Sequence, residues 1–179
     1  MEQTKYFPTV EAIEKASGVL EEILTPTPFQ KNNNLSDIYG AEVYLKREDL
    51  QMVRSYKIRG AYNKIRTIEP ELLKNGIVCA SAGNHAQGVA LAATKNGIKS
   101  TICLPDCAPI SKVEATKKYG AEICLVEGVY DDAYQRAIEL KEEHGYTFVH
   151  PFDDVSVIAG QGTIGLELIN QLQQIDAVI

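Results

Sequence analysis

The strongest constraint on the fold is a regular alternation of short apolar runs and longer amphipathic segments that begins after Pro70. Short apolar runs are typical of strands buried on both faces, and apolar residues every three or four positions are typical of helices. Buried strands joined by single helices favour right-handed crossovers in a parallel sheet. The predicted fold class is therefore α/β, with parallel-sheet layers and helices on both faces. The predicted strands are 76–80, 99–104, 121–126 and 146–149, and the predicted helices between them are 84–95, 110–119 and 131–144.

The segments on either side of this alternation are less regular. Thr9 is a suitable N-cap for a helix over 10–16 that would end at Gly18. Two prolines keep residues 25–28 extended, since proline restricts the residue that precedes it. The remaining predictions are a polar turn at 32–36, a strand at 42–46, a loop at 151–154, a helix at 163–172 and the start of a strand at 176–179.

Charge and hydropathy exclude several classes of partner. The chain of 179 residues carries 18 Lys and Arg against 24 Asp and Glu, a net charge of −6, so it has no basic field to attract nucleic acid or an anionic membrane surface. It contains no apolar run of about eighteen residues, the length that a membrane span needs. Residues 1–8 lack the basic start and apolar stretch of a signal peptide. We expect a cytoplasmic protein with no nucleic-acid or membrane partner.

The four cysteines agree with a reducing compartment. Cys79, Cys103 and Cys124 each lie in an apolar run that predicts a buried strand, where a free thiol behaves as a small hydrophobic group. Cys107 has neither a second cysteine pair nor suitably spaced histidines that would complete a ligand set. We expect no metal site.

One lysine, Lys57, stands at the start of the helical pattern that precedes the alternation. Apolar residues recur there at helical spacing, Ser55 fits the N-cap, and Glu69-Pro70 ends the pattern. The positive end of a helix dipole disfavours an ammonium in the first turn and should lower the pKa of Lys57, which suits a lysine that acts as a neutral nucleophile. The alternative is a solvated lysine at a helix end.

Residues 81–88, Ser-Ala-Gly-Asn-His-Ala-Gln-Gly, connect a predicted strand to a predicted helix. The carboxyl ends of parallel strands are where α/β sheets bind ligands. Gly83 permits close backbone approach, the free N–H groups of the helix start suit a carboxylate or phosphate, and Asn84 can both donate and accept hydrogen bonds. The alternative is a capped helix whose Asn84 and His85 satisfy local backbone groups.

A second glycine cluster, residues 160–165, matches the dinucleotide-binding pattern G-x-G-x-x-G. That pattern requires a strong strand before it and an acidic residue about twenty positions after it. Here only the short run 155–158 precedes the glycines, and the sequence ends too soon after them. We therefore favour glycines that allow a helix to pack closely against a neighbour.

Together, Lys57 and residues 81–88 indicate a site for a substrate that carries an amine and a carboxylate, with the lysine as covalent partner. A lysine amine forms Schiff bases with carbonyl compounds, including pyridoxal phosphate, whose ring acts as an electron sink for negative charge at the α-carbon of an amino acid. No Ser-His-Asp order, paired-carboxylate spacing or phosphate loop in the sequence competes with this interpretation.

Several blocks of the sequence resemble the pyridoxal-phosphate-dependent threonine and serine dehydratases, enzymes of the tryptophan-synthase-β fold (fold type II). The blocks occur in the family's order and spacing, from about residue 20 onward. Residues 53–57, Val-Arg-Ser-Tyr-Lys, are more similar to biosynthetic threonine dehydratases (threonine ammonia-lyases) than to catabolic enzymes or serine racemases, which usually have Gly-Ser-Phe-Lys there. The blocks that carry the resemblance are 25–28, 46–51, 55–61, 81–88 and 160–163.

The resemblance implies a role for each matching site residue. Lys57 would hold pyridoxal 5'-phosphate through its amine and abstract the substrate α-proton, with Tyr56 beside the cofactor ring. Asn84 would bond the ring hydroxyl. Loss of the β-hydroxyl of threonine would then give 2-oxobutanoate and ammonia, the first step toward isoleucine. The substrate carboxylate would be received by Ser81, Ala82, Gly83, Asn84 and His85.

The resemblance also implies a truncated catalytic region. The family's phosphate-binding loop and the partner of the ring nitrogen would lie beyond Ile179, so we expect this chain alone to be inactive or nearly so. Family members usually form dimers or tetramers, which implies a homo-oligomer at full length. The implied parts are 1–55, the N-terminal part of the large cofactor domain; 56–150, the small α/β domain; and 151–179, the return into the large domain.

Two alternatives stay open. A serine dehydratase or serine racemase of the same fold would use the same residues, and product analysis with L-threonine and L-serine distinguishes these enzymes. A non-catalytic fragment or binding module would keep the fold without the chemistry.

Overall fold

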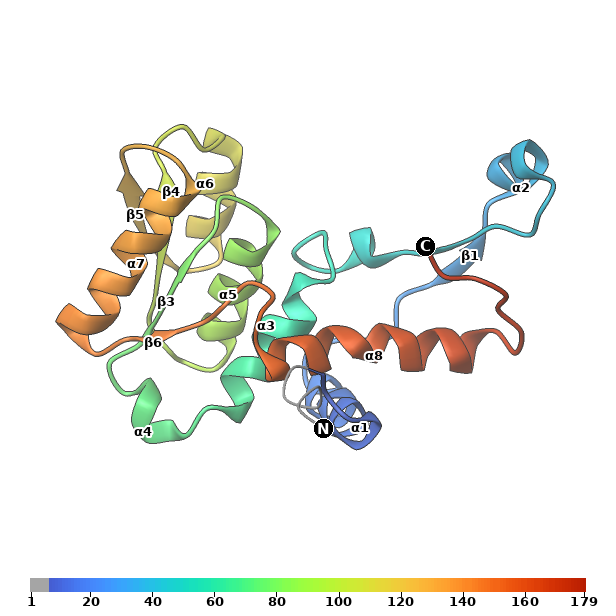
Figure 1. Cartoon of the computed structure of the whole chain (residues 1–179), viewed down its shortest axis with the longest axis horizontal. Coiled ribbons are helices and arrows are strands. Elements are labelled where there is room, and N and C mark those ends of the chain that lie inside the picture. The colour runs from blue at the N-terminus through green and yellow to red at the C-terminus, as the bar shows by residue number, and fades with distance from the viewer. Residues whose placement is uncertain (1–6) are drawn as a thin grey trace.

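The computed structural model describes residues 7–179, which form a sheet-containing lobe and an extension built around one long helix (Figure 1). Helix α3 lies between these two parts, and the two-stranded sheet β1-β2 lies at the far end of the extension. Within the described part of the chain, no helix is both long and apolar enough to cross a membrane.

The lobe contains a four-stranded sheet in which every neighbouring pair is parallel, with the strand order β5-β4-β3-β6. Its strands and the helices between them begin and end within one or two residues of the predicted positions, so the predicted α/β class is confirmed. These elements are β3 (Ile77–Ala80), α5 (Asn84–Lys95), β4 (Ser100–Pro105), α6 (Ile110–Lys118), β5 (Glu122–Val126), α7 (Tyr130–His144) and β6 (Thr147–Phe148).

The two faces of the sheet are covered by different helices. Ile77 and Cys79 of β3 pack with residues of α3 and α5 on one face, whereas Val78 and Ala80 pack with α7 on the other. All four side chains are fully buried. Successive strand residues point to opposite faces, so a strand covered on both sides must be apolar throughout. Cys103 is likewise buried in β4, as predicted for a free thiol in a core strand.

The remaining elements surround the long helix α8. Thr9 caps the first helix as predicted, since its Oγ1 accepts a hydrogen bond of 3.2 Å from the Ala12 N–H. These elements are α1 (Val10–Leu20), β1 (Phe29–Lys31), α2 (Asn33–Tyr39), β2 (Tyr44–Lys46), the 3₁₀ helix η2 (Glu48–Leu50), α3 (Lys57–Thr67), α4 (Pro70–Leu73) and α8 (Val155–Gln171).

Three predicted segments in this part were wrong, in addition to the predicted start of α8. Helix α1 continues past Gly18 because its next turn buries Leu20 in the core. The predicted turn at 32–36 is the start of α2, where the Asn32 side chain accepts a hydrogen bond from the Leu35 N–H and acts as N-cap. Residues 176–179 are not a strand, since no strand in the described part of the chain pairs with them.

Helix α8 begins at Val155, well before the predicted start at Thr163, because Asp154 is a strong N-cap. Its Oδ1 accepts hydrogen bonds from the N–H groups of Ser156 and Val157, at 2.9 and 3.2 Å. The glycine cluster 160–165 therefore lies inside a helix and does not form a strand-to-helix turn. The preference for close packing over dinucleotide binding is confirmed at Gly160, where an added Cβ would lie 2.5 Å from the Arg59 carbonyl oxygen.

Candidate functional site

Two loops meet at the carboxyl edge of the sheet. Residues 81–83 follow β3, and residues 149–154 follow β6. Strands β3 and β6 are parallel neighbours, with Val78 opposite Phe148, so their carboxyl ends lie side by side. This edge is the position where α/β sheets bind ligands.

Lys57 reaches this edge from the first residue of α3. Its Nζ donates a hydrogen bond of 2.8 Å to the carbonyl oxygen of Pro151, in the loop after β6. The same Nζ lies 5.5 Å from the centre of the Tyr56 ring. Burial of the Lys57 side chain lowers the pKa of its amine. The sequence predicted a lowered pKa for Lys57 and attributed it to the helix dipole. In the structure, the cause is burial.

Close packing of α3 against α5 brings Lys57 next to the first two turns of α5, where its charge acts on His85. A Cβ added at Gly88 of α5 would lie 3.1 Å from the backbone carbonyl carbon and oxygen of Lys57. Because contacts of this length are tighter than ordinary van der Waals contacts, glycine is needed for the two backbones to approach so closely. Lys57 and the turn after β3, distant in sequence, are therefore parts of one site.

The backbone before α3 has an uncommon conformation. Arg54 adopts the left-handed region with φ of 58°, and its N–H donates a hydrogen bond of 2.8 Å to the carbonyl oxygen of Gln51. The helix N-cap is Tyr56, one residue later than predicted, although Ser55 Oγ accepts a weak hydrogen bond of 3.4 Å from the Lys57 N–H. A non-glycine residue adopts this region only at some cost in free energy, so contacts with the surrounding structure hold the backbone at Arg54.

The turn from β3 to α5 leaves the start of the helix open to a ligand. Gly83 is the N-cap, and no side chain within residues 7–179 caps the helix. The Gly83 N–H donates a hydrogen bond of 3.2 Å to Ser81 Oγ, which fixes the turn. A Cβ added at Gly83 would meet no atom within 4 Å, so the space beside its backbone is open. Uncapped N–H groups at a helix start bind anions.

Asn84 is exposed at the first position of α5, and its Oδ1 accepts a hydrogen bond of 3.3 Å from Lys112 Nζ of α6. The Asn84 amide nitrogen can still donate to a ligand. His85 is different, because its side chain is buried and its Nε2 lies 3.2 Å from the carbonyl oxygen of Val149. The side chain of His85 thus binds the backbone after β6, and only its N–H group belongs to the open helix start.

The His85 ring is neutral at pH 7. Burial lowers its pKa to about 4, the nearby charges of Lys57 and His150 act in the same direction, and the hydrogen bond to Val149 partly opposes them. Because Nε2 must donate to that carbonyl oxygen, Nδ1 is deprotonated, and this buried atom has no hydrogen-bond partner among the described residues.

We expect His85 to make the protein sensitive to acid. Its pKa is lower in the folded state than the ordinary value of 6.5, so stability is complete above pH 6.5 and falls as the pH approaches 4. The expected loss in the free energy of unfolding is about 3 kcal/mol. Urea unfolding at several pH values should show a smaller loss for His85→Gln, which does not titrate. An equal pH-dependent loss in the variant would contradict this assignment.

These residues fit a pyridoxal group. Lys57 offers an amine with a lowered pKa, Asn84 offers an amide, and the uncapped start of α5 offers N–H donors for a carboxylate or a phosphate. The sequence did not reveal the Pro151 carbonyl oxygen as the acceptor for Lys57. The one indication in the sequence that residues 151–154 belong to the site was their position directly after a predicted parallel strand.

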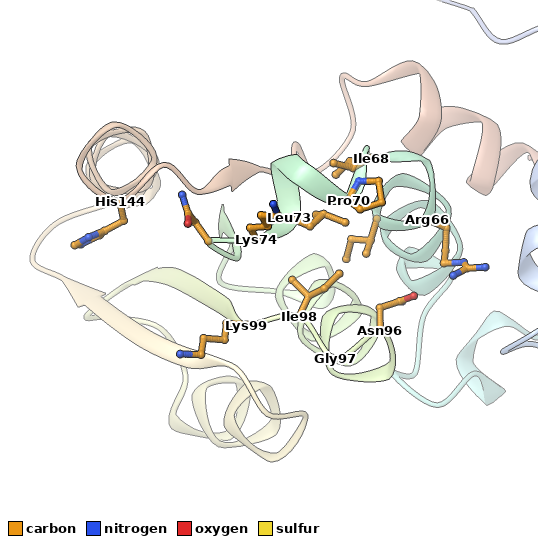
Figure 2. A pocket seen from close by; sticks show the side chains of 12 residues that line it. Arg66, Ile68, Pro70, Leu73, Lys74, Asn96, Gly97, Ile98, Lys99 and His144 are labelled. Atoms are coloured by element: carbon orange, nitrogen blue, oxygen red, sulfur yellow. The ribbon is translucent and has the colours of Figure 1, made fainter.

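A pocket with a volume of about 770 Å³ lies elsewhere, at the amino end of the sheet (Figure 2). Its basic side chains include Arg66, Lys74, Lys99 and His144. The first two are paired with Glu22 and Glu71, and His144 lies 3.8 Å from Glu143. Since Lys57 reaches the opposite edge of the sheet, we do not assign this pocket to the candidate site.

The sequence of this chain is similar to a known protein family and to several known proteins. The family model described as pyridoxal-phosphate dependent enzyme matches residues 20–179. The L-threonine ammonia-lyase of Thermotoga maritima is 48% identical over 171 residues, which cover 96% of this chain and 43% of that protein. The biosynthetic L-threonine dehydratase of Bacillus subtilis is 45% identical over 166 residues, which cover 91% of this chain and 39% of that protein.

The fold agrees with a solved structure of maize serine racemase. That structure matches with a TM-score of 0.92 at 34% identity and covers 96% of this chain and 52% of the racemase. The chain spans less than half the length of the two curated relatives described above.

Proposed function

Because the chain belongs to the pyridoxal-phosphate dependent enzyme family, we propose that the full-length protein is a lyase that converts L-threonine to 2-oxobutanoate and ammonia. The observation that carries this proposal is the position of Lys57. Its half-buried amine, with a lowered pKa, lies beside the uncapped start of α5. A covalent amine and an anion site so placed suit an amino-acid substrate.

Each residue of the site has a proposed task. When bound, pyridoxal 5'-phosphate supplies an electron sink for negative charge at the substrate α-carbon. Lys57 holds the cofactor and takes the α-proton at Nζ, with Tyr56 beside the ring. Asn84 binds the ring hydroxyl, and the turn formed by residues 81–85 binds the substrate carboxylate through its backbone donors. Contacts to the cofactor phosphate and ring nitrogen are proposed to come from elsewhere in the full-length protein.

The division of the chain into parts is also a proposal. We assign 56–150 to a small α/β domain, and 1–55 and 151–179 to a larger cofactor domain. The four-stranded sheet, which lies within 77–148, and the packing of α1 against α8 through Ile13 and Gly162 support this division. Cytoplasmic location, homo-oligomer formation and a place in isoleucine biosynthesis stay predictions.

Product analysis tests the function directly. We expect the purified full-length protein with pyridoxal phosphate to form 2-oxobutanoate from L-threonine with a higher kcat/KM than it forms pyruvate from L-serine. The similarity to maize serine racemase makes racemisation the second candidate, so D-serine is measured in the same reactions. Faster pyruvate or D-serine formation would replace the proposed function, and absence of all three products would favour a binding module.

A further inference from the structure

A buried cluster of charges lies directly behind Lys57. The Arg59 side chain is only 1% exposed, although it carries a permanent charge. Its Nε and Nη2 donate hydrogen bonds of 2.8 and 2.7 Å to the two carboxylate oxygens of Glu48. Its Nη1 donates to Thr163 Oγ1 at 3.0 Å and to Glu167 Oε1 at 2.6 Å. Arg59 thus connects η2, α3 and α8 through one guanidinium.

A second cation completes the cluster. Lys46 of β2 forms an ion pair with Glu167 and donates hydrogen bonds of 2.8 Å to the carbonyl oxygen of Thr27 and to Gln171 Oε1. We call the four charged residues Lys46, Glu48, Arg59 and Glu167 the Arg59 cluster. Its two positive and two negative charges cancel. Burial alone would raise the pKa of Glu48, but hydrogen bonds from Arg59 and Thr27 outweigh it and lower that pKa, so the carboxylate stays charged.

The Arg59 cluster acts on the same helical turn that carries Lys57. Residues two apart on a helix differ by about 200° in direction, so Lys57 faces the carboxyl edge of the sheet while Arg59 faces α8. The Arg59 backbone is itself in close contact with α8, since only glycine fits at position 160. The cluster therefore fixes both the rotation and the position of the first turn of α3.

The acceptor of the Lys57 hydrogen bond belongs to the segment that leads into α8. Pro151 lies three residues before Asp154, the N-cap of that helix. Two further contacts hold α3 beside this segment: Lys64 pairs with Asp154 at 2.7 Å, and Asn63 Nδ2 donates to the Ser156 carbonyl oxygen at 2.7 Å. The amine and its acceptor thus lie on two elements whose relative position depends on Arg59.

We propose that Arg59 is a positioning residue for Lys57, which locks the first turn of α3 onto η2 and α8 and so holds the Lys57 amine at the Pro151 carbonyl oxygen. This inference rests on the proposed function for the identity of Lys57 as the reactive amine. Residues 46–48 and 59 lie in blocks of the sequence that resemble the dehydratases, but the resemblance gave them no role. The proposal assigns them one, the positioning of Lys57.

Competitive acetylation of the cofactor-free, full-length protein tests the position of the amine without using its activity. Acetic anhydride is applied over a range of pH, and labelling of the Lys57 peptide is compared with that of the exposed Lys117 peptide. In Arg59→Met we expect Lys57 to lose its burial, so its reactivity should titrate at higher pH than in the wild type. We expect kcat to fall about 100-fold, the effect of a misplacement of about 1 Å. Arg59→Lys should restore part of the wild-type pH dependence of Lys57 acetylation and part of the wild-type kcat.

Two controls separate positioning from general stability. Arg136→Met removes a partly exposed arginine that also binds two glutamates, Glu139 and Glu143. This variant should leave the pH dependence of Lys57 acetylation, the Lys57 profile, unchanged. Leu140→Ala weakens the α7 side of the core and should lower the melting temperature without moving that profile. The titratable neighbours Tyr56, His85 and His150 are unaltered in every variant.

A folded Arg59→Met protein with the wild-type Lys57 profile and kcat would overturn the proposal. If that variant does not fold, Arg59→Lys and Glu167→Gln, which keep hydrogen-bonding groups in place, decide the question by the same profile. Failure of the proposed function gives a different result. Acetylation needs neither cofactor nor substrate, so a shifted Lys57 profile without threonine deamination would reject the function and retain the positioning role.

Discussion

Replacement of Lys57 by alanine is expected to reduce threonine deamination by the full-length protein by about 10³-fold, within the range that a positioned proton-transfer group contributes. The variant would lose the amine that we propose holds the cofactor, which is also the proposed base for the α-proton. Because the Lys57 side chain is only half-buried at the start of α3, we expect the fold to be retained. Steady-state kinetics and a circular dichroism spectrum measure the two effects separately.

Borohydride reduction identifies the lysine that binds the cofactor. In the wild-type protein, reduction with pyridoxal phosphate followed by peptide mapping should place the label on the peptide that contains Lys57, and the Lys57→Ala protein should carry no label above background. Lys117→Ala is the matched control, since Lys117 is exposed and paired with Glu114 on α6. A label on another lysine, or full activity of Lys57→Ala, would disprove the assignment.

Replacement of Gly160 by alanine is expected to lower the free energy of unfolding, by up to about 2 kcal/mol. The new Cβ would lie 2.5 Å from the Arg59 carbonyl oxygen and 2.9 Å from Asn63 Cβ, so the backbones of α3 and α8 must move apart. Overpacking of this kind costs about 1–3 kcal/mol. Alanine also favours a helix over glycine by about 1 kcal/mol, which offsets part of the cost. We expect a lower melting temperature in a calorimetric scan of the full-length protein.

Gly165→Ala is the matched control on the same helix. An added Cβ there meets no atom within 4 Å, so only the helix preference acts and the free energy of unfolding should rise by about 1 kcal/mol. Opposite signs at positions 160 and 165 are the expected result. Equal effects at the two positions would show that contact with α3 does not explain the glycine at 160.

Most of the sheet could be predicted from the sequence because its residues face the core on both sides. Val78 and Cys79 are neighbours in β3 but pack on opposite faces, and both are fully buried. An unbroken apolar run is the only composition that satisfies this environment. The parts that were wrong lie outside the sheet. Helix α2, with no buried residue, and the early start of α8 depend on the caps Asn32 and Asp154.

The site could be predicted in part. Lys57 and residues 81–85 were selected by residue type and by position at the ends of predicted elements, and the structure brings them together. Their contacts could not be foreseen, because the Pro151 carbonyl oxygen and the close approach of Gly88 to the Lys57 backbone are backbone features without a residue-type signal. His85 was expected to donate to a substrate, whereas its side chain is directed to Val149.

The sequence alone determined the α/β class and the order of the strands and helices from β3 to β6, and it singled out Lys57 as the candidate for covalent chemistry. These properties follow from local periodicity, capping and residue chemistry, all of which depend on residues that are close together in the sequence. Only the tertiary structure decided that Arg59 and Glu167, 108 positions apart, share one buried cluster, and that Lys57 meets the loop after β6. Such contacts depend on how α3 packs between the sheet and α8, and packing over long separations leaves no periodic pattern in the chain.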